Sequence, residues 1–335
     1  MRILRRLLKA VFLLLLLLTG VYFLGPKVDK PLLTMNLPAV ESNLAALQKR
    51  INERESLNTK IKANNESQII WYDSIPGKTE YAILYLHGWS ASREEGAPLH
   101  MELGQRYGAN VYLPRLEGHG IREEQAMLHL TATDYFESAK EALAIAKQIG
   151  KKVIVMGTST GGTLALYLAQ GDKDIAALLL YSPNVKIYDP TAVLLSGPWG
   201  LQIAKTVMDS DFYESEADSL KRSYWTTRYR VEALTQLQAL LDVTMKPEVF
   251  QRIHQPTFMG YYYKNEEEQD KVVSVPALLE MYDELGVESH LKRKVAFPEV
   301  GNHVMTSYIT SKDLESVRKE TIGFLEEVVQ LQPVN

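Results

Sequence analysis

One stretch of sequence decides the fold of this chain: Lys152–Ala169, which reads KVIVMGTSTGGTLALYLA. Its first five residues form a β-branched apolar run that predicts a buried strand, and its last eight have the apolar spacing of a helix. Between them lies the pattern Gly157-x-Ser159-x-Gly161, which predicts a sharp strand–turn–helix elbow. Glycines are expected in this turn because the backbone is strained at the serine and leaves little room beside it. Ser159 is therefore the candidate nucleophile.

Further apolar runs lie on both sides of this elbow. The patterns predict strands over residues 67–72, 81–86, 111–113, 175–183, 257–263 and 291–297, and helices over residues 98–107, 134–150, 275–285 and 311–331. This alternation predicts an α/β fold whose mostly parallel sheet is covered by helices on both faces. In such a sheet, the elbow and the loops that follow the other parallel strands meet at one carboxyl edge.

The alternation stops between residues 185 and 250. Two stretches there, Ala192–Met208 and Trp225–Leu241, have helical spacing without a buried strand between them. We interpret this insertion as a helical lid over the carboxyl edge, with ordinary extra helices as the alternative. The apolar side chains of this lid are Val193, Leu194, Leu195, Trp199, Leu201, Ile203, Val207 and Met208.

The N-terminal residues predict an export signal. Residues 7–24 are almost wholly apolar, which is marginally long enough to span a membrane. Four basic residues within the first nine place the N-terminus in the cytoplasm and the rest of the chain across the membrane. Thr19-Gly20-Val21 and the bulky residues 21–24 make poor small-residue cleavage sites, so an uncleaved signal anchor is favoured over a cleaved signal peptide. A cleaved leader would leave a secreted or periplasmic protein instead.

The segment that follows is predicted to connect this anchor to the main domain. Pro26, Pro31 and nearby charges suit an extended linker from residue 25 to about residue 36. Residues 37–57 have helical apolar spacing, and their polar positions mix Glu with Lys and Arg. This mixture favours a helix packed on the domain over one that lies on the bilayer.

Composition excludes several classes of function. The chain has 335 residues, 46% of them hydrophobic, enough for a large core. It has no cysteine, which excludes disulfides, thiolate catalysis and cysteine-ligated zinc. No basic patch interleaved with aromatic residues is present, so nucleic acid is not expected as a partner. The sequence contains no P-loop, no G-x-G-x-x-G and no histidine–carboxylate cluster with metal-ligand spacing, so neither a cofactor nor a metal is expected.

A serine nucleophile needs a base to accept its proton. Among the seven histidines, His303 follows the last predicted strand and so lies at the carboxyl edge. His87 also ends a strand but belongs to a different motif, and His119 lies between two glycines, where a structural hydrogen bond is the commoner use. The remaining histidines are interpreted as surface residues: His100, His129, His254 and His290.

The base in turn needs a carboxylate to orient it. The loop after the strand 257–263 offers Asp270, whose backbone is anchored by the apolar pair that follows Lys271. The glutamates at 266–268 are interpreted as a solvated run of charge, with Glu268 or Glu267 kept as alternative acids. The chain order Ser159, Asp270, His303 is the order expected of an α/β hydrolase.

An acyl-transfer site also needs two backbone N–H donors for the oxyanion. Thr160 follows the nucleophile directly and is expected to supply one. The second is expected from Trp89, because His87-Gly88 before it allows the loop to approach the elbow closely.

With these motifs in hand, residues from about Gln68 to Leu331 resemble the α/β-hydrolase superfamily. The resemblance rests on Leu86-His87-Gly88-Trp89, residues 157–162, Asp270-Lys271-Val272-Val273 and Gly301-Asn302-His303. The loop Pro114–Gly120 also resembles the P-x-x-x-G-H-G loop of the monoglyceride-lipase, lysophospholipase and serine-aminopeptidase-like branch. The resemblance implies a Ser159–His303–Asp270 triad and no cofactor.

These observations predict a serine hydrolase that cleaves a carboxylic ester, such as a monoacylglycerol or lysophospholipid, and is held at the membrane by its N-terminal helix. A peptidase or amidase with the same triad is one alternative, and a catalytically silent membrane-tethered binding protein is another. The predicted organisation is an anchor or signal peptide at 1–25, a linker and amphipathic helix at 26–65, a first core part at 66–184, a lid at 185–250 and a second core part at 251–335.

Overall fold

A seven-stranded sheet forms the centre of the computed structural model, which describes residues 2–334. Its strand order is β1-β3-β2-β4-β5-β8-β9, and every pairing is parallel except that of β1 with β3. The strands are β1 (Gln68–Ile70), β2 (Thr79–Leu86), β3 (Asn110–Leu113), β4 (Gly150–Thr158), β5 (Ile175–Tyr181), β8 (Thr257–Tyr261) and β9 (Lys292–Ala296). The predicted mostly parallel sheet is confirmed.

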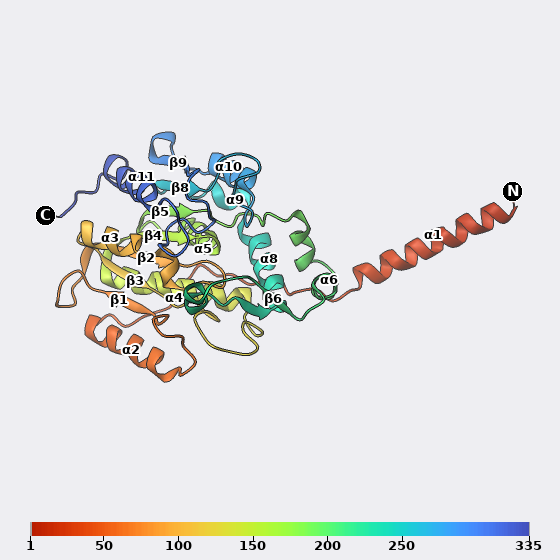
Figure 1. The fold of residues 1–335 in the computed structure, drawn as a ribbon, viewed down its shortest axis with the longest axis horizontal. Helices are drawn as coiled ribbons and strands as arrows, with labels where there is room; N and C mark the ends of the chain where they lie inside the picture. The colour runs from red at the N-terminus through yellow and green to blue at the C-terminus, as the bar shows by residue number, and fades with distance from the viewer. Residues whose placement is uncertain (1, 335) are drawn as a thin grey trace.

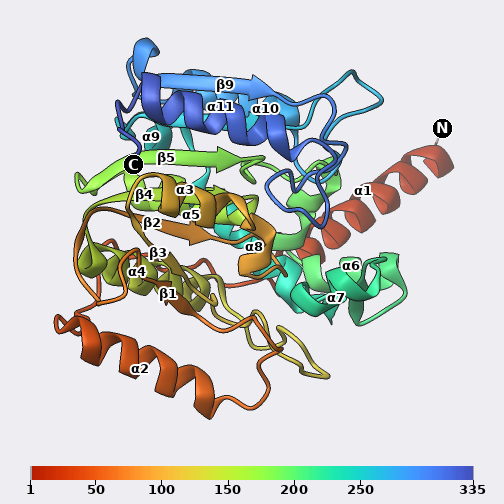
Figure 2. The same cartoon turned by 60° about the vertical axis from the view of Figure 1, so that its left-hand side comes forward.

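Helices cover both faces of this sheet (Figures 1 and 2). Helices α3 (Leu99–Arg106) and α11 (Leu314–Glu327) pack on one face, and α4 (Ala132–Ile149), α5 (Thr160–Ala169) and α10 (Val275–Glu284) pack on the other. Successive side chains of a strand point to opposite faces of the sheet. Strand β2 therefore contributes Ile83 and Tyr85 to the core under α3 and α11, and Leu84 to the core under the other three helices. Both faces of the sheet are buried, which explains why its strands are continuous apolar runs.

The register of the sheet fixes where its strands end. Leu86 of β2 pairs with Gly157 of β4, and Thr158 of β4 pairs with Tyr181 of β5. The loops after β2, β4, β5, β8 and β9 therefore open at one carboxyl edge, as expected for parallel strands.

The insertion between β5 and β8 differs from the two predicted helices. Residues 192–208 form a 3₁₀ helix, η2 (Pro190–Ser196), and a separate helix, α6 (Gly200–Met208), because Pro198 cannot continue a helix and Trp199 has a left-handed φ of 63°. The prediction for 225–241 is wrong in its first part. Residues 225–231 are not helical: they include β7 (Arg228–Arg230), which pairs with β6 (Phe212–Glu214) on the other side of α7 (Ser219–Tyr224). Helix α8 (Glu232–Thr244) begins only after them and is followed by the short α9 (Pro247–Phe250).

The N-terminal helix α1 (Arg2–Phe23) projects away from the rest of the molecule (Figure 1) and buries none of its side chains. Within residues 2–334 it is the one helix long and apolar enough to cross a membrane, a property that signal sequences share. The C-terminal end of α1, Val21–Phe23 (the foot of α1), contacts the insertion, because the Trp199 indole donates to the Val21 carbonyl at 3.2 Å. Just after α1, the Pro26 carbonyl accepts from the Trp199 amide at 2.7 Å.

The residues that follow α1 lie on the domain. The predicted linker is extended but not free, because Pro31 is buried and Lys140 donates to the Thr34 hydroxyl at 3.0 Å. The predicted helix 37–57 is shorter than expected: α2 (Leu44–Leu57) begins after Asn43, whose side chain caps it by accepting from the Ala46 amide. Helix α2 packs on the domain through Leu47 and Ile51, as predicted.

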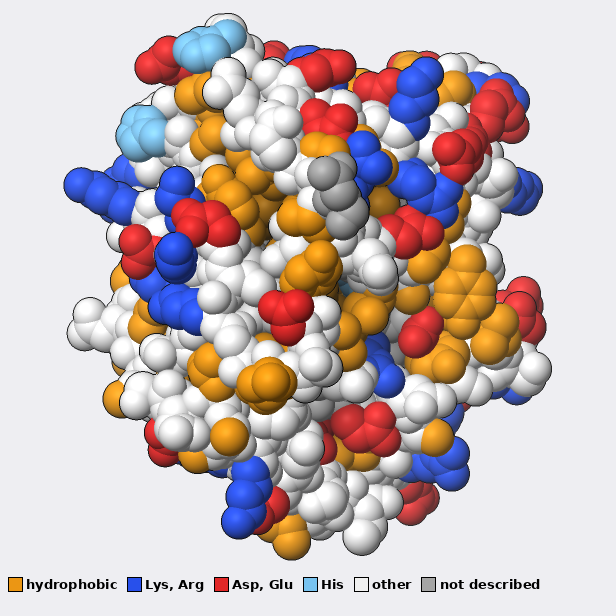
Figure 3. All heavy atoms as spheres, turned by 90° about the vertical axis from the view of Figure 1, so that its left-hand side faces the viewer, with side chains coloured by type: hydrophobic (Ala, Val, Ile, Leu, Met, Phe, Trp, Pro, Cys, Tyr) orange, Lys and Arg blue, Asp and Glu red, His pale blue; other side chains and the backbone are white. Residues whose placement is uncertain are grey.

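The end of the molecule away from α1 carries interspersed acidic and basic side chains among apolar and neutral ones (Figure 3). This mixture is typical of a solvated protein surface.

Candidate active site

Ser159 lies at the turn between β4 and α5, as the elbow motif predicts. Its φ of 53° and ψ of −122° are strained for a residue with a side chain. The turn has no room for larger residues: a Cβ on Gly161 would collide with the Leu86 carbonyl, and one on Gly157 would lie 2.6 Å from the Gly161 carbonyl oxygen. The two glycines are therefore required by packing against backbone.

Asp270 and His303 are hydrogen-bonded to each other, with 2.6 Å between Asp270 Oδ2 and His303 Nδ1. The second carboxylate oxygen of Asp270 accepts from the amides of Val272 at 2.9 Å and Val273 at 3.1 Å. The backbone amides of the two residues after Lys271 thus orient this carboxylate. Glu266, Glu267 and Glu268 are exposed, so the prediction of a solvated charge run is confirmed.

The pair is buried, and its charges influence each other. Burial disfavours the ionised carboxyl, but the His303 charge and hydrogen bond outweigh it, so the pKa of Asp270 lies below its ordinary value. Burial likewise disfavours protonated His303, but Asp270 outweighs it and raises the pKa of His303. His303 Nε2 is buried and has no hydrogen-bond partner within residues 2–334. This nitrogen is left available for a substrate or a nucleophile.

The His303 loop contacts the elbow. Thr306 Oγ1 lies 3.5 Å from Thr158 Oγ1, one residue before the candidate nucleophile. Ser159 and the Asp270–His303 pair therefore occur at the same edge of the sheet. A base beside a serine, oriented by a carboxylate, is the arrangement that activates a hydroxyl for acyl transfer.

The predicted oxyanion loop, His87-Gly88-Trp89 directly after β2, also lies against the elbow. A Cβ on Gly88 would lie 3.0 Å from Ser159 Cβ, so the backbone before Trp89 passes directly beside the serine. Thr160 is the first residue of α5, where the N–H groups of a helix have no intrahelical acceptor. The two candidate donors thus flank Ser159 from two separate segments.

Aromatic side chains pack against Trp89 of this loop. The His119 ring stacks on Tyr135 at 5.1 Å between centroids, and Trp89 meets the edges of both rings. His87 Nε2 accepts from the Leu116 amide at 3.2 Å, and burial lowers the pKa of His87 to about 4. His119 makes the structural hydrogen bond predicted for it, with 2.7 Å between its Nδ1 and the Glu117 carbonyl oxygen, and burial lowers its pKa.

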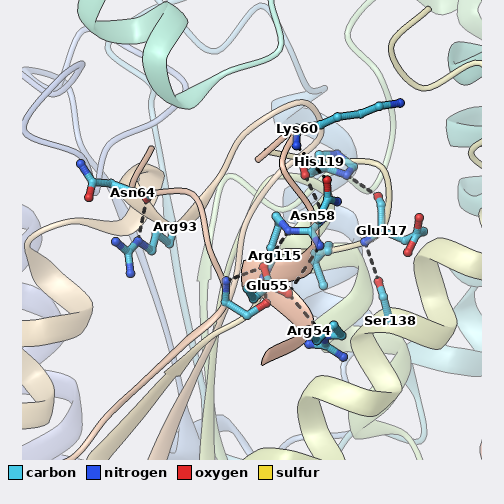
Figure 4. Close-up of polar contacts among 12 residues, drawn as sticks. Arg54, Glu55, Asn58, Lys60, Asn64, Arg93, Arg115, Glu117, His119 and Ser138 are labelled. Carbon is cyan, nitrogen blue, oxygen red and sulfur yellow. Dashed lines mark hydrogen bonds and ion pairs between the residues drawn. The ribbon is translucent and has the colours of Figure 1, made fainter. Parts of the chain in front are cut away.

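The loop 114–120 is hydrogen-bonded to helix α2 (Figure 4). Arg115 Nε donates to the Glu55 carboxylate at 2.8 Å, and Arg115 also donates to the His119 carbonyl at 3.3 Å. Glu55 is buried and additionally accepts from the Ser67 amide at 3.0 Å. Helix α2, which lies outside the sheet, therefore holds the loop 114–120, and this loop packs against the oxyanion loop through His119 and Trp89.

Sequence patterns missed two buried groups. His100, predicted to be on the surface, is 2% exposed, and its Nε2 bonds the Arg93 carbonyl oxygen at 3.0 Å. Burial lowers its pKa to about 4. Glu95 is also 2% exposed and lies beside the oxyanion loop, although its segment, SREEG, has the composition of an exposed turn. The other three predicted surface histidines are exposed.

Within residues 2–334, no group of three or more His, Cys, Asp or Glu residues is arranged to hold a metal ion.

Comparison with known proteins bears on this geometry. A thermostable monoacylglycerol lipase of Bacillus sp. (strain H-257) is 36% identical over 105 residues, which are 31% of this chain and 41% of that enzyme. The chain thus matches less than half the length of this relative.

Solved structures agree in fold. A metagenome-derived lipolytic enzyme superposes with a TM-score of 0.64 at 18% identity, covering 80% of this chain and 100% of that one. The monoacylglycerol lipase of Paleococcus ferrophilus gives a TM-score of 0.57 at 15% identity over 79% of this chain and 98% of its own. Residues 83–308 match the family model described as the alpha/beta hydrolase family, so the chain belongs to that family and has its fold.

Proposed function

We propose that the protein is a serine hydrolase of carboxylic esters in which Ser159, His303 and Asp270 act as a catalytic triad. The observation that carries this proposal is the 2.6 Å bond between Asp270 and His303 at the edge that bears Ser159. It leaves His303 Nε2 buried and, among residues 2–334, without a hydrogen-bond partner. The monoacylglycerol-lipase relative supports ester chemistry.

In the first half of the reaction, Ser159 Oγ attacks the ester carbonyl carbon while His303 Nε2 takes its proton. Asp270 holds the ring through Nδ1 and stabilises the imidazolium. The amides of Trp89 and Thr160 bind the oxyanion. The carbon–oxygen bond to the alcohol then breaks, and the alcohol leaves with the proton from His303.

In the second half, water attacks the acyl-enzyme and gives a proton to His303. The bond between the acyl carbon and Ser159 Oγ then breaks, the carboxylic acid leaves with the oxygen from water, and His303 returns the proton to Ser159 Oγ. No cofactor takes part in either half.

The substrate proposed is an acyl ester of some hydrophobicity, such as a monoacylglycerol or a lysophospholipid. The insertion supports this because Val193, Leu194 and Val207 are exposed on it, and it contacts the foot of α1. We infer that residues 185–250 act as a lid between the two core parts, 66–184 and 251–335.

The proposed location is a membrane, with α1 as a single uncleaved anchor and the catalytic domain on the extracytoplasmic side. Basic residues precede the apolar run, which supports this orientation. The linker and helix of residues 26–65 then hold the domain close to the anchor.

The test is covalent labelling of the full chain in detergent with a fluorophosphonate probe, together with hydrolysis of a short-chain ester and its matched amide. We expect labelling and ester turnover in the wild type, and loss of both in Ser159→Ala, by roughly 10⁴-fold or more in kcat. Folded wild-type protein that neither labels nor hydrolyses the ester would contradict an enzymatic function. Faster turnover of the amide would indicate a peptidase or amidase.

A further inference from the structure

A second buried carboxyl lies at the site besides that of Asp270. Glu95 belongs to the short 3₁₀ helix η1 (Arg93–Gly96) after β2, and it is 2% exposed. Its Oε2 accepts from the Gly88 amide at 2.5 Å and from the Tyr85 hydroxyl at 3.0 Å. Within residues 2–334 it forms no ion pair, so these dipoles replace a counter-ion for it. A buried carboxyl without a cation is costly, which marks it as a group with a purpose beyond packing.

The carboxyl of Glu95 is separated from the elbow only by Gly88. A Cβ on Gly88 would lie 2.8 Å from Glu95 Oε1 and 3.0 Å from Ser159 Cβ. A side chain at this position would therefore collide with the Glu95 carboxyl and crowd Ser159. The oxyanion loop is consequently held between the carboxylate and the candidate nucleophile, and the Gly88 amide points at the carboxylate.

Glu95 also joins the two other segments of the site. Thr306, in the His303 loop, donates its hydroxyl to the Glu95 carbonyl at 2.8 Å. The Tyr85 hydroxyl, which donates to the carboxylate, also lies 3.1 Å from Thr158 Oγ1 and accepts from it, one residue before the nucleophile. One residue thus connects the oxyanion loop, the end of β4 and the loop of the candidate base.

The charges of Glu95 and His303 are coupled. Burial raises the pKa of Glu95 to about 7, although the His303 charge opposes this rise. In return, ionised Glu95 adds to the Asp270 effect that raises the pKa of His303. The other groups that act on them are Lys221 of α7, whose charge lowers both pKa values, and Tyr85 and Tyr135, whose pKa values Glu95 raises.

We propose that Glu95 is a positioning residue of the hydrolase site: its carboxylate fixes Gly88 so that the Trp89 amide faces the oxyanion, and its charge stabilises protonated His303 during acyl transfer. This inference rests on the proposed ester hydrolysis. The two parts act on different quantities, because a misplaced oxyanion donor lowers kcat and a missing charge changes the pH dependence.

The test compares Glu95→Ala and Glu95→Gln in the full chain, with kcat, KM and the pH profile of kcat/KM on a dissolved short-chain ester. Alanine removes both the acceptor for Gly88 and the charge, so kcat should fall about 100-fold with KM within about twofold. Glutamine keeps an acceptor but loses the charge. Its kcat should fall only about tenfold, and the acid limb of its profile should move to lower pH because His303 loses a proton more easily.

Matched variants keep the test decisive. Glu94→Gln changes the neighbouring carboxyl, which is not hydrogen-bonded to Gly88, and should leave both kcat and the pH profile unchanged.

If the Glu95 variants do not fold, as judged by thermal unfolding, Tyr85→Phe provides a second test, because it removes one donor to the Glu95 carboxylate. It should shift the acid limb in the same direction by a smaller amount, because Glu95 is then protonated at higher pH.

The outcomes separate this inference from the proposed function. An acid limb that coincides with the wild type in Glu95→Gln and in Tyr85→Phe, or a kcat unchanged in Glu95→Ala, overturns the role of Glu95 alone. A folded wild type without labelling at Ser159 and without ester turnover overturns the proposed function and this inference with it.

Discussion

The carboxyl edge of the sheet and the insertion at residues 185–250 differ in how tightly their residues are packed. At the edge, backbone and side chains interlock, so that Gly161 abuts the Leu86 carbonyl and Asp270 is held by two amides. In the insertion, short elements follow one another, and Val207 is 80% exposed. Dense packing fixes position at the edge, whereas the insertion keeps an apolar surface uncovered. The first region is therefore suited to chemistry and the second to contact with an apolar partner.

The largest expected effect tests whether Asp270 and His303, at the carboxyl edge, act together with Ser159 in hydrolysis. Asp270→Asn should lower kcat by about 10⁴-fold, because the amide cannot stabilise the imidazolium or hold the same tautomer of His303. Glu268→Gln is the matched control, since this carboxylate is exposed in the same loop and should leave kcat unchanged. The measurement is steady-state hydrolysis of a short-chain ester. Near-wild-type turnover of Asp270→Asn together with an inactive Glu268→Gln would show that the acid is misassigned.

The second prediction compares one methyl group in each region. Gly161→Ala places a Cβ against the backbone of Leu86 and should destabilise the protein by about 2–3 kcal/mol. Gly197→Ala, in the insertion, meets its first atom at 3.4 Å and has an ordinary φ of −78°, so it should change stability by less than about 0.5 kcal/mol. Thermal unfolding of the full chain in detergent measures both. Equal losses would show that the insertion is packed as tightly as the edge.

The same difference explains what could be predicted from the sequence. Residues 152–169 predict a strand, an elbow and a helix, and β4 and α5 extend this by only a few residues. Buried parallel strands are continuous apolar runs, so their pattern and their structure have the same cause. Asp270 and His303 could be chosen because each follows such a strand, and parallel strands bring their following loops together.

Prediction failed where local pattern and tertiary packing diverge. The apolar spacing of 192–208 continues through Gly197-Pro198, although proline ends a helix, and Trp199 adopts a left-handed conformation there. The sequence interpretation places His100 on the surface, and the sequence pattern does not identify Glu95 as buried. Each side chain bonds a backbone group seven residues away, the Gly88 amide for Glu95 and the Arg93 carbonyl for His100, and no residue spacing reveals such a bond.

The smallest expected effect concerns the apolar surface of the insertion. Val207→Asp puts a charge on α6, near the foot of α1, and should lower hydrolysis of a long-chain monoacyl ester in phospholipid vesicles by roughly fivefold. Hydrolysis of a dissolved short-chain ester should not change, because Val207 lies outside the triad and its hydrogen bonds. Ile75→Asp is the matched control, since this residue is 77% exposed but precedes β2, at the opposite edge of the sheet. Equal effects of the two variants on vesicles would remove the distinction drawn between an edge that reacts and an insertion that meets the lipid.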